Sequence, residues 1–300
     1  MLKRTITGAV IFVFTLAFVL LKQVSGLFFD AFALIIMMAS VYETISAYKK
    51  AGTKTLEVGL YIVPALLCGL WNLPISAYKI FVLEALVALV LVLSAITVEI
   101  IIFAKQRKLG TTEPNAEVLN KSLFNLTKST MQVFAYPILP LSFLFALNHL
   151  GYEIGYIGIV LIFAVSMLTD TMAYFIGRFC GRHKFIPEVS PNKTVEGVVG
   201  GFIGGLIGAL ICYFIFYYSS LFGVLVEAGK AKSIISFLII GIFGAYANQL
   251  GDLVASAMKR KIGIKDYSNL FPGHGGFMDR VDGLMFVTVF SYIILTLFFV

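Results

Sequence analysis

The amino-acid sequence predicts an all-α polytopic integral membrane protein with about nine transmembrane helices. Three observations support this fold class. Hydrophobic residues make up 59% of the 300 residues and charged residues only 13%, whereas a water-facing surface needs many more polar side chains. Apolar runs of about 20 residues, the length that crosses a bilayer, recur along the chain. Basic residues gather in alternate connecting segments. The composition excludes a soluble enzyme, a disordered chain and a secreted disulfide scaffold.

Nine apolar segments are expected to form the membrane-spanning helices. The first three are short, so tilting, pairing or a partly interfacial position are alternatives for them. The segments are residues 5–21, 26–42, 56–71, 78–103, 131–148, 154–177, 197–218, 234–255 and 283–300.

The distribution of basic residues predicts the orientation of these helices. With the N-terminus inside, the inner segments hold 19 of the 23 lysines and arginines, and the outer segments hold four. Cytoplasmic loops carry such an excess, so we expect a cytoplasmic N-terminus and a C-terminus outside. Loops that face anionic lipid also account for the net charge of +7 without a nucleic-acid partner, and the pattern suits a bacterial plasma membrane. The four outer basic residues are Lys22, Lys79, Lys230 and Lys232.

The chain divides by composition into two regions. Residues 1–130 form an N-terminal transmembrane region that ends in a basic inner loop, 105–130, part of which has the pattern of an amphipathic interfacial helix. Residues 131–300 form a C-terminal region in which polar residues crowd two predicted cytoplasmic loops, 178–196 and 259–280. We therefore expect any chemistry to lie in this second region.

The densest polar segment begins within the eighth apolar segment. Four side chains share one face if this segment is helical, because they are spaced at i, i+4, i+7 and i+8. They are Asp252, Ser256, Lys259 and Arg260. An acid inside a membrane helix usually faces protein, water or a cation. The alternative is an intrahelical ion pair between Asp252 and Lys259, with the basic side chains reaching to the headgroups.

A Gly- and Pro-rich loop follows this face. Lys265 and Asp266 lead into it, and His274, Gly275 and Gly276 lie near its end. Glycines allow a close approach of the backbone, and their amides can line an anion site. The loop is therefore a candidate binding site for phosphate groups.

Carboxylates return to the same membrane surface directly after the loop. Asp279 and Asp282 lie at i and i+3 at the start of the last apolar segment, with Arg280 between them. Helix capping is the alternative explanation for both acids. Hard oxygen ligands such as Asp252 and Asp279 suit Mg²⁺, which takes one or two carboxylates together with phosphate oxygens of a substrate.

A second polar cluster comes from two upstream segments. Asp170 lies inside the sixth apolar segment, where an ion pair with Arg178 is the alternative to a role in a site. Ser190 and Lys193 belong to the sequence Ser-Pro-Asn-Lys-Thr, which has a phosphate-binding composition but lacks the spacing of a P-loop. Alone, this segment is a weak signal.

Together these residues resemble the signature of the phosphatidate cytidylyltransferases, also called CDP-diacylglycerol synthases. The similarity runs without a gap over 27 positions, from Ser256 to Asp282. Residues 170–178 and 190–197 are similar to upstream motifs of that family. For residues 1–130 the likeness rests on hydropathy alone.

The resemblance implies a helical membrane fold, a homodimer, and a catalytic C-terminal region, 131–300, with a polar active-site cavity open to the cytoplasm. The reaction that it implies is transfer of the cytidylyl group of CTP to phosphatidate, which yields CDP-diacylglycerol and pyrophosphate. It also implies a divalent-metal centre in which Asp252 and Asp279 are the metal-binding carboxylates. The substrate-site residues that it implies are Ser256, Lys259, Arg260 and Asp282.

The residues present suit this chemistry. A phosphate monoester with a second pKa of about 6 is largely dianionic at neutral pH, so it needs no activated side chain as nucleophile. Metal ions and basic groups must instead bring two polyanions together and stabilise the departing pyrophosphate. We therefore expect Mg²⁺, as one ion or with a second cation, on Asp252 and Asp279. The expected catalytic residues are Asp252, Asp279, Lys259 and Arg260, and the expected substrate-binding residues are Ser256, Lys193, Ser190, Lys265, Asp266, His274, Gly275, Gly276, Arg280, Asp282 and Asp170.

Two alternative functions remain. A CTP-dependent lipid kinase or another lipid nucleotidyltransferase would use the same phosphate-binding residues, and a kinase would add a general base such as Asp266 or His274. An ion-coupled transporter would use Asp170 and Asp252 as coupling carboxylates and would show broken helices in both halves of the chain. Acidic and Gly/Pro-interrupted elements are concentrated in one half, which counts against a transporter.

Overall fold

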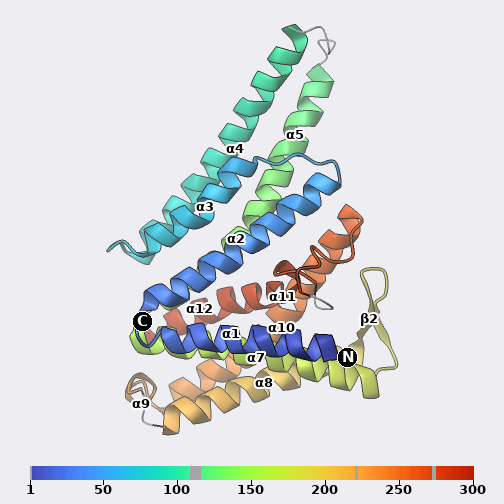
Figure 1. Ribbon diagram of the computed structural model, residues 1–300. Helices are drawn as coiled ribbons and strands as arrows, with labels where there is room; N and C mark the ends of the chain where they lie inside the picture. The colour runs from blue at the N-terminus through green and yellow to red at the C-terminus, as the bar shows by residue number, and fades with distance from the viewer. Residues whose placement is uncertain (1, 109–115, 220–221, 272–274) are drawn as a thin grey trace. The chain divides into compact units, whose positions relative to one another are not determined.

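The computed structural model describes residues 2–108, 116–219, 222–271 and 275–300, and within them helices dominate (Figure 1). A π-helical turn, η1 (Phe134–Ile138), joins α5 to α6, and the two strands are β1 (Lys184–Ile186) and β2 (Ser190–Thr194). The helices are α1 (Leu2–Leu21), α2 (Gly26–Lys50), α3 (Glu57–Trp71), α4 (Ala77–Lys108), α5 (Ala116–Val133), α6 (Leu139–Asn148), α7 (Tyr152–Phe179), α8 (Val195–Tyr218), α9 (Val224–Glu227), α10 (Lys230–Ile262), α11 (Met278–Val281) and α12 (Leu284–Phe299).

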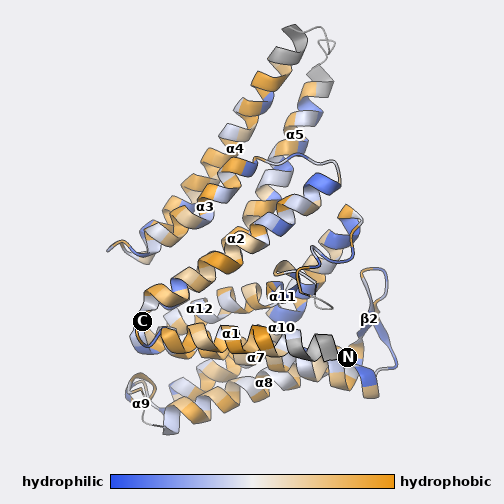
Figure 2. Cartoon of the chain, viewed as in Figure 1, coloured by the Kyte–Doolittle hydropathy of each residue, from blue (hydrophilic) through white to orange (hydrophobic). Residues whose placement is uncertain are grey.

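The predicted all-α membrane fold is confirmed in its coarse form. Six helical stretches of the described chain are long and apolar enough to cross a membrane: Gly26–Lys50, Ala77–Ala104, Leu119–Asn148, Tyr152–Phe179, Val195–Tyr218 and Lys230–Ile262. The three other predicted spans coincide with shorter apolar helices, Thr7–Leu21, Glu57–Trp71 and Leu284–Phe299. Figure 2 shows hydrophobic residues along the helices and hydrophilic residues at the β1–β2 hairpin. The number of crossings and the sides of the two termini stay predictions.

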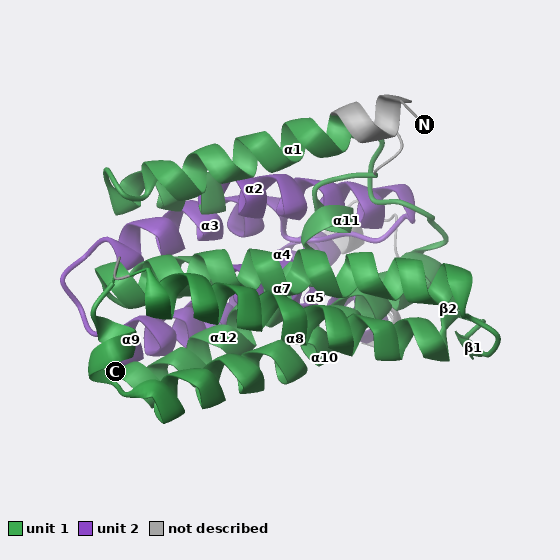
Figure 3. Cartoon of the chain, turned by 90° about the horizontal axis from the view of Figure 1, so that it is seen from below, with its two compact units in different colours: residues 1–33, 143–300 green, residues 34–142 purple. Residues whose placement is uncertain are grey.

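The chain folds as two compact units, which Figure 3 colours separately. Unit 1 consists of residues 1–33 and 143–300, and unit 2 of residues 34–142. This division differs from the regions 1–130 and 131–300 that composition suggests, because α1 belongs to the same unit as the C-terminal helices. Hydropathy does not reveal this division, because packing between apolar helices depends on shape and small residues.

Unit 2 is organised around α4 and α5, which pack against each other. Hydroxyl groups of α5 fix the loop between α2 and α3. Ser129 donates a hydrogen bond to the Lys54 carbonyl oxygen, and Thr130 Oγ1 accepts one from the Leu56 amide at 3.0 Å. The loop therefore has a defined path along α5.

The segment predicted to hold an interfacial helix and a separate span forms two helices, α5 and α6, which meet across a kink at η1. Pro137 lacks an amide hydrogen and so interrupts the regular ladder of hydrogen bonds. The kink lies at Tyr136, which precedes Pro137 and has non-helical dihedral angles.

Unit 1 is held together by close packing of α7, α8 and α10. A Cβ atom at Gly204 would lie 2.1 Å from the Leu168 carbonyl oxygen of α7, and one at Gly205 would lie 2.6 Å from Ala245 Cβ of α10. Only glycine permits this approach, as in other membrane helix pairs. Two stripes on α8 have this role: Gly200, Gly204 and Gly208 face α7, and Gly201 and Gly205 face α10.

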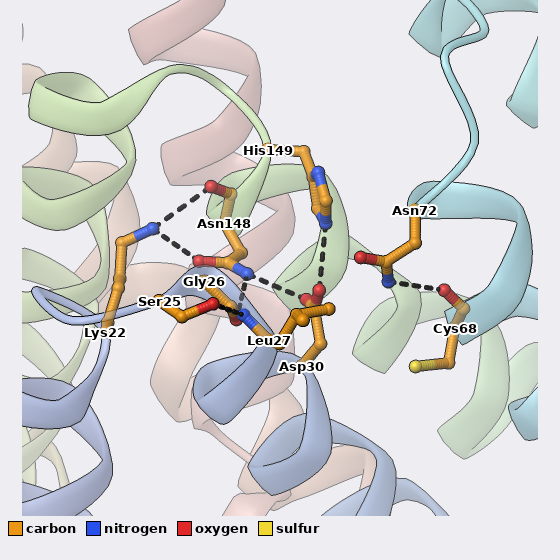
Figure 4. Close-up of polar contacts among 9 residues, drawn as sticks. All are labelled: Lys22, Ser25, Gly26, Leu27, Asp30, Cys68, Asn72, Asn148 and His149. Atoms are coloured by element: carbon orange, nitrogen blue, oxygen red, sulfur yellow. Dashed lines mark hydrogen bonds and ion pairs between the residues drawn. The ribbon is translucent and has the colours of Figure 1, made fainter.

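A buried polar network joins the α1–α2 turn to the end of α6 within unit 1 (Figure 4). The Lys22 ammonium donates to the side-chain oxygen of Asn148 and, at 3.1 Å, to its carbonyl oxygen. Asn148 donates to Asp30 Oδ1 at 2.8 Å, and His149 Nε2 lies 3.0 Å from Asp30 Oδ2. Burial lowers the pKa of Lys22 to about 8, and the Asp30 carboxylate acts in the opposite direction. Hydrogen bonds thus offset part of the cost of burying these groups.

The predicted loop 178–196 contains an antiparallel β-hairpin, so the all-α prediction is incomplete here. Strands β1 and β2 pair, with Lys184 opposite Thr194. Thr194 Oγ1 then caps α8 by accepting a hydrogen bond from the Gly197 amide at 3.1 Å. Short strands with Pro and Asn lack the alternating pattern that would reveal them in the sequence.

The second predicted loop, 259–280, is shorter than expected because α10 continues to Ile262. Gly263 ends α10 in the left-handed conformation, with φ of +80°. Beyond the loop, Asp279 lies on the four-residue helix α11, and Asp282 lies in the break before α12. Asp282 and Gly283 keep helical dihedral angles, so the two acids remain at i and i+3 on the helical path that leads into α12.

Candidate active site

The polar face predicted on α10 is present, since α10 is helical throughout residues 230–262. Asp252 Oδ1 accepts a long hydrogen bond of 3.4 Å from Ser256 Oγ. Lys259 and Arg260 lie in the last turn of α10, where the helix dipole favours positive charge. One helix therefore presents an acid, a hydroxyl and two cations in a row.

The β-hairpin supplies the partner of Asp252. Lys193 Nζ lies 2.7 Å from Asp252 Oδ2, whereas the intrahelical pair with Lys259 that the sequence left open does not form. Arg260 Nε donates to the Val189 carbonyl oxygen at 3.3 Å and so links the hairpin to α10 a second time. The Asp252 side chain remains 40% exposed, which leaves it accessible to a ligand.

Asp279 organises the loop that precedes α11. Its Oδ1 lies 2.7 Å from Lys259 Nζ, and its Oδ2 accepts hydrogen bonds from the amides of Tyr267 at 3.0 Å and Gly276 at 2.9 Å. Gly275 has φ of +75°, and a Cβ there would lie 2.7 Å from Asp279 Oδ2. The Gly276 amide, which we expected to line an anion site, thus binds Asp279 in this structure.

Asp170 reaches the site from α7. Asn248 of α10 donates to Asp170 Oδ1 at 2.6 Å and accepts from Ser166 Oγ at 2.7 Å, so its amide is held from both sides. The alternative pair with Arg178 is not found, because Arg178 donates to the Tyr174 hydroxyl at 2.5 Å. The charged groups within electrostatic range of Asp170 are Asp252, Lys193 and Arg280.

Asp282 lies half-buried in the break between α11 and α12. Its pKa rises to about 8, first because burial disfavours the charged form and then because the Asp252 carboxylate is close, whereas the Lys259 ammonium lowers it. A Cβ at Gly251 would lie 2.2 Å from the Asp282 carbonyl oxygen, so glycine allows α10 to approach this break. Asp170, Asp252 and Asp282 therefore share one electronegative region.

The donor set suits a hard cation, with a different fit at each acid. Within the described ranges, no three acidic, histidine or cysteine side chains gather closely enough for a complete metal cage. Mg²⁺ needs only one or two carboxylates when substrate phosphates complete its shell. Asp252 is accessible, and a cation would relieve its repulsion with neighbouring carboxylates. Asp279 already accepts from three donors, so a cation there would have to displace Lys259.

Most of the predicted site residues meet in this region, and a few do not. The side chains of Ser190, Lys265 and Asp266 make no hydrogen bond or ion pair with the described part of the chain. His274 lies outside the described residues. The other residues are linked to one another by direct contacts or lie within electrostatic range. They are Asp170, Lys193, Asp252, Ser256, Lys259, Arg260, Gly275, Gly276, Asp279, Arg280 and Asp282.

The sequence analysis missed several residues that shape the site. Asn248 orients Asp170, and the carbonyl oxygen of Gln249 lies 3.4 Å from Lys193 Nζ. Two amide side chains in an otherwise apolar helix, just before Asp252, were a usable signal, because polar groups inside membrane helices are costly and usually functional. The Tyr267 amide gave no signal, since every residue but proline carries the same donor.

Comparison with known proteins identifies the family to which this arrangement belongs. The pattern of the cytidylyltransferase family matches residues 2–298 of the chain. The chain belongs to the cytidylyltransferase family. This membership confirms the family that the segment from Ser256 to Asp282 suggested.

Several bacterial proteins named phosphatidate cytidylyltransferase resemble this cytidylyltransferase-family chain. The one from Bacillus subtilis (strain 168) is 39% identical over 130 residues, which cover 43% of the chain and 44% of the relative. Those from Staphylococcus saprophyticus and Staphylococcus aureus (strain COL) are 34% and 32% identical over 170 residues, 57% of the chain and 60% of each relative. The matched stretch thus spans between 44% and 60% of these relatives' own length.

Proposed function

We propose that this chain transfers the cytidylyl group of CTP to phosphatidate and releases pyrophosphate. The observation that carries the proposal is a pair of matched contacts: Lys193 with Asp252 and Lys259 with Asp279, each at 2.7 Å. Ammonium groups and carboxylates from a hairpin and two helices meet in a chain that is otherwise apolar. Membership of the cytidylyltransferase family and the names of the relatives support the choice of this reaction.

In the proposed reaction, an oxygen of the lipid phosphate forms a bond to the α-phosphorus of CTP. The bond between that phosphorus and the bridging oxygen of the β-phosphate breaks, and pyrophosphate leaves with the electron pair. The lipid phosphate has a second pKa of about 6 and is largely deprotonated, so no side chain has to remove a proton from it. The protein contributes position and positive charge, from Lys193, Lys259, Arg260 and Arg280.

We further propose that Asp252 and Asp279 hold Mg²⁺, as one ion or with a second cation. When bound, the metal supplies charge neutralisation on the phosphate oxygens. The Lys259 ammonium would then leave the Asp279 carboxylate and bind a phosphate group of the substrate. Asp282 would support a basic residue or the second cation. We also propose that a further set of residues contacts the substrates. They are Asp170, Ser190, Ser256, Lys265, Asp266, His274, Gly275 and Gly276.

The apolar helices and the bacterial relatives indicate an integral membrane protein. We propose that it lies in a bacterial plasma membrane with the active site facing the cytoplasm and the N-terminus on the same side. The proposal rests on the excess of basic residues in alternate segments, to which Lys193, Lys259 and Arg260 belong. A homodimer is proposed on the family resemblance alone.

The test of this function follows the label of CTP. Purified full-length protein is incubated with phosphatidate, Mg²⁺ and CTP labelled at either the α- or the γ-phosphorus. We expect the α-label to enter the lipid, the γ-label to leave as pyrophosphate, and a chelator to stop both. Incorporation of the γ-label into lipid would establish a lipid kinase and overturn the proposal.

A matched pair of variants connects the assay to the site. Asp252→Asn should lower kcat/KM by roughly 10²-fold or more, the scale of losing one electrostatic group of an active site. Glu227→Gln changes an exposed acid of α9 and should leave the rate unchanged. Full activity of Asp252→Asn would contradict its assignment.

A further inference from the structure

Unit 2 contains a cavity of about 370 Å³ that the proposed reaction does not use. Its wall consists of the α2–α3 loop, residues 52–57, together with Lys49 of α2, Leu126 of α5 and a stretch of α4. The α4 residues are Val98, Glu99 and Ile102, which lie near the end of the candidate span Ala77–Ala104. A cavity at the end of a membrane span lies at the depth of lipid headgroups.

The deepest charged group of this cavity is Glu99, which is only 4% exposed. Its Oε1 accepts a hydrogen bond from the Ser122 hydroxyl, whereas its Oε2 is buried without a hydrogen-bond partner in the described part of the chain. A buried polar atom without a partner costs free energy. Glu99 Oε2 is therefore suited to accept a hydrogen bond from a ligand.

The outer part of the cavity carries positive charge. Lys49 is 73% exposed and makes a single contact of 3.4 Å with Glu57. Lys54 is exposed, and its ammonium forms no ion pair with another described residue. Two accessible ammonium groups at a membrane surface suit a phosphate group.

The charges of the lining fit a zwitterion better than an anion. Lys49 and Lys54 balance Glu57 and Glu99, so the formal charge of the lining is zero. The two signs are also separated, with the buried Glu99 carboxylate inside and the exposed ammonium group of Lys54 outside. A ligand with a phosphate and a positively charged donor at opposite ends matches this order.

We propose that this cavity binds a phosphate ester that carries a primary ammonium group, namely the headgroup of phosphatidylethanolamine. The phosphate lies against Lys54 and Lys49, and the ammonium donates to Glu99 Oε2. Val98, Ile102 and Leu126 supply apolar surface for the lipid beyond the headgroup. Phosphatidylcholine has the same charges but no N–H group, so it cannot make the bond to Glu99.

Lipid binding to the purified full-length protein tests the proposal by native mass spectrometry. Phosphatidylethanolamine, phosphatidylcholine and phosphatidylglycerol with identical acyl chains are the probes. We expect phosphatidylethanolamine to bind about tenfold more tightly than phosphatidylcholine, the worth of one charge-assisted hydrogen bond. Equal binding of these two lipids, or strongest binding of anionic phosphatidylglycerol, would overturn the proposal.

Three variants assign the selectivity to the cavity. Glu99→Gln keeps an acceptor for Ser122 and should abolish the preference for phosphatidylethanolamine over phosphatidylcholine. Lys54→Met should weaken the binding of both lipids to the same extent. Lys79→Met, in the first turn of α4, is the matched control and should change neither. An unchanged preference in Glu99→Gln would refute the site even if the Lys54 variant behaved as expected.

A competition experiment distinguishes the two sources of this headgroup. Soluble phosphoethanolamine at millimolar concentration should fail to displace the lipid, because it lacks the apolar part that the cavity wall contacts. Displacement by the soluble ester would overturn the assignment to a membrane lipid. Neither readout depends on catalysis, so the inference survives or fails separately from the proposed function.

Discussion

Asp252 and Asp279 lie in different surroundings, although both are proposed to bind the metal. The Asp252 side chain is 40% exposed and has one close ammonium partner, Lys193. Asp279 is only 4% exposed and accepts from Lys259 and from two backbone amides. Loss of an exposed ion pair costs little, whereas unpaired buried donors cost about 1–3 kcal/mol each. The two acids should therefore respond differently to the same substitution.

We predict that Asp279→Asn lowers both activity and stability, and that Asp252→Asn lowers activity alone. An asparagine at 279 keeps one acceptor oxygen for three donors, so the free energy of unfolding should fall by roughly 1–3 kcal/mol. For Asp252→Asn the change should stay within about 1 kcal/mol. Thermal unfolding without CTP or metal measures the stabilities, and label transfer from CTP measures the activities. Equal melting temperatures for the two variants would show that Asp279 does not anchor the loop.

The helix α8 is the element on which the geometry of the site depends. Its glycine stripes fix the distances to α7, which carries Asp170, and to α10, which carries Asp252. We predict that Gly204→Ala destabilises the protein by about 1–3 kcal/mol and reduces activity, because the new Cβ would lie 2.1 Å from the Leu168 carbonyl oxygen. A backbone oxygen cannot turn away, so the two helices must separate.

Gly69→Ala in α3 is the matched control for this prediction, since no atom lies within 4 Å of its Cβ position. The substitution should be neutral or stabilising by about 0.5–1 kcal/mol, the helix-propensity difference between the two residues. Melting temperatures measure the stability of both variants, and label transfer from CTP measures their activity. Equal effects at Gly204 and Gly69 would mean that the α7–α8 contact tolerates a side chain.

Local patterns predicted the long apolar helices and the face of α10 but not the β-hairpin or the pairing of the charges on α10. The spacing from Asp252 to Arg260 needs only the helical period, so it was legible in the sequence. The partner of Asp252 is Lys193, which comes from a hairpin whose short strands have no alternating pattern. Asp279 is held by backbone amides, and these carry no residue-specific signal. Tertiary contacts of this kind are set by helix packing, which a single sequence does not display.

On the scale of the whole molecule, the short helices decide the topology. The 15 residues of α3 rise about 22 Å and the 16 residues of α12 about 24 Å, less than the hydrocarbon core of about 30 Å. Such helices cross only if the bilayer thins or flanking residues extend the span. If the six long stretches alone crossed, the termini would lie on the same side, whereas nine crossings separate them.

We predict that the termini lie on opposite sides, with the N-terminus in the cytoplasm. Nineteen of the 23 basic residues fall in inner segments when all nine segments cross, and 17 do so when only the six long stretches cross, so the nine-crossing topology follows the distribution of basic residues more closely. Reporter fusions in a bacterial host test this directly. Alkaline phosphatase, which is active only outside, should be active at the C-terminus, and green fluorescent protein should fluoresce at the N-terminus. The reciprocal fusions serve as controls, and a fluorescent C-terminal fusion would require an even number of crossings. If only the six long stretches crossed, Lys193 and Lys259 would remain on the side of the N-terminus, whereas loss of either α1 or α3 alone as a crossing would move both away from the cytoplasmic CTP. A fusion placed directly after Gly283 would distinguish these two cases.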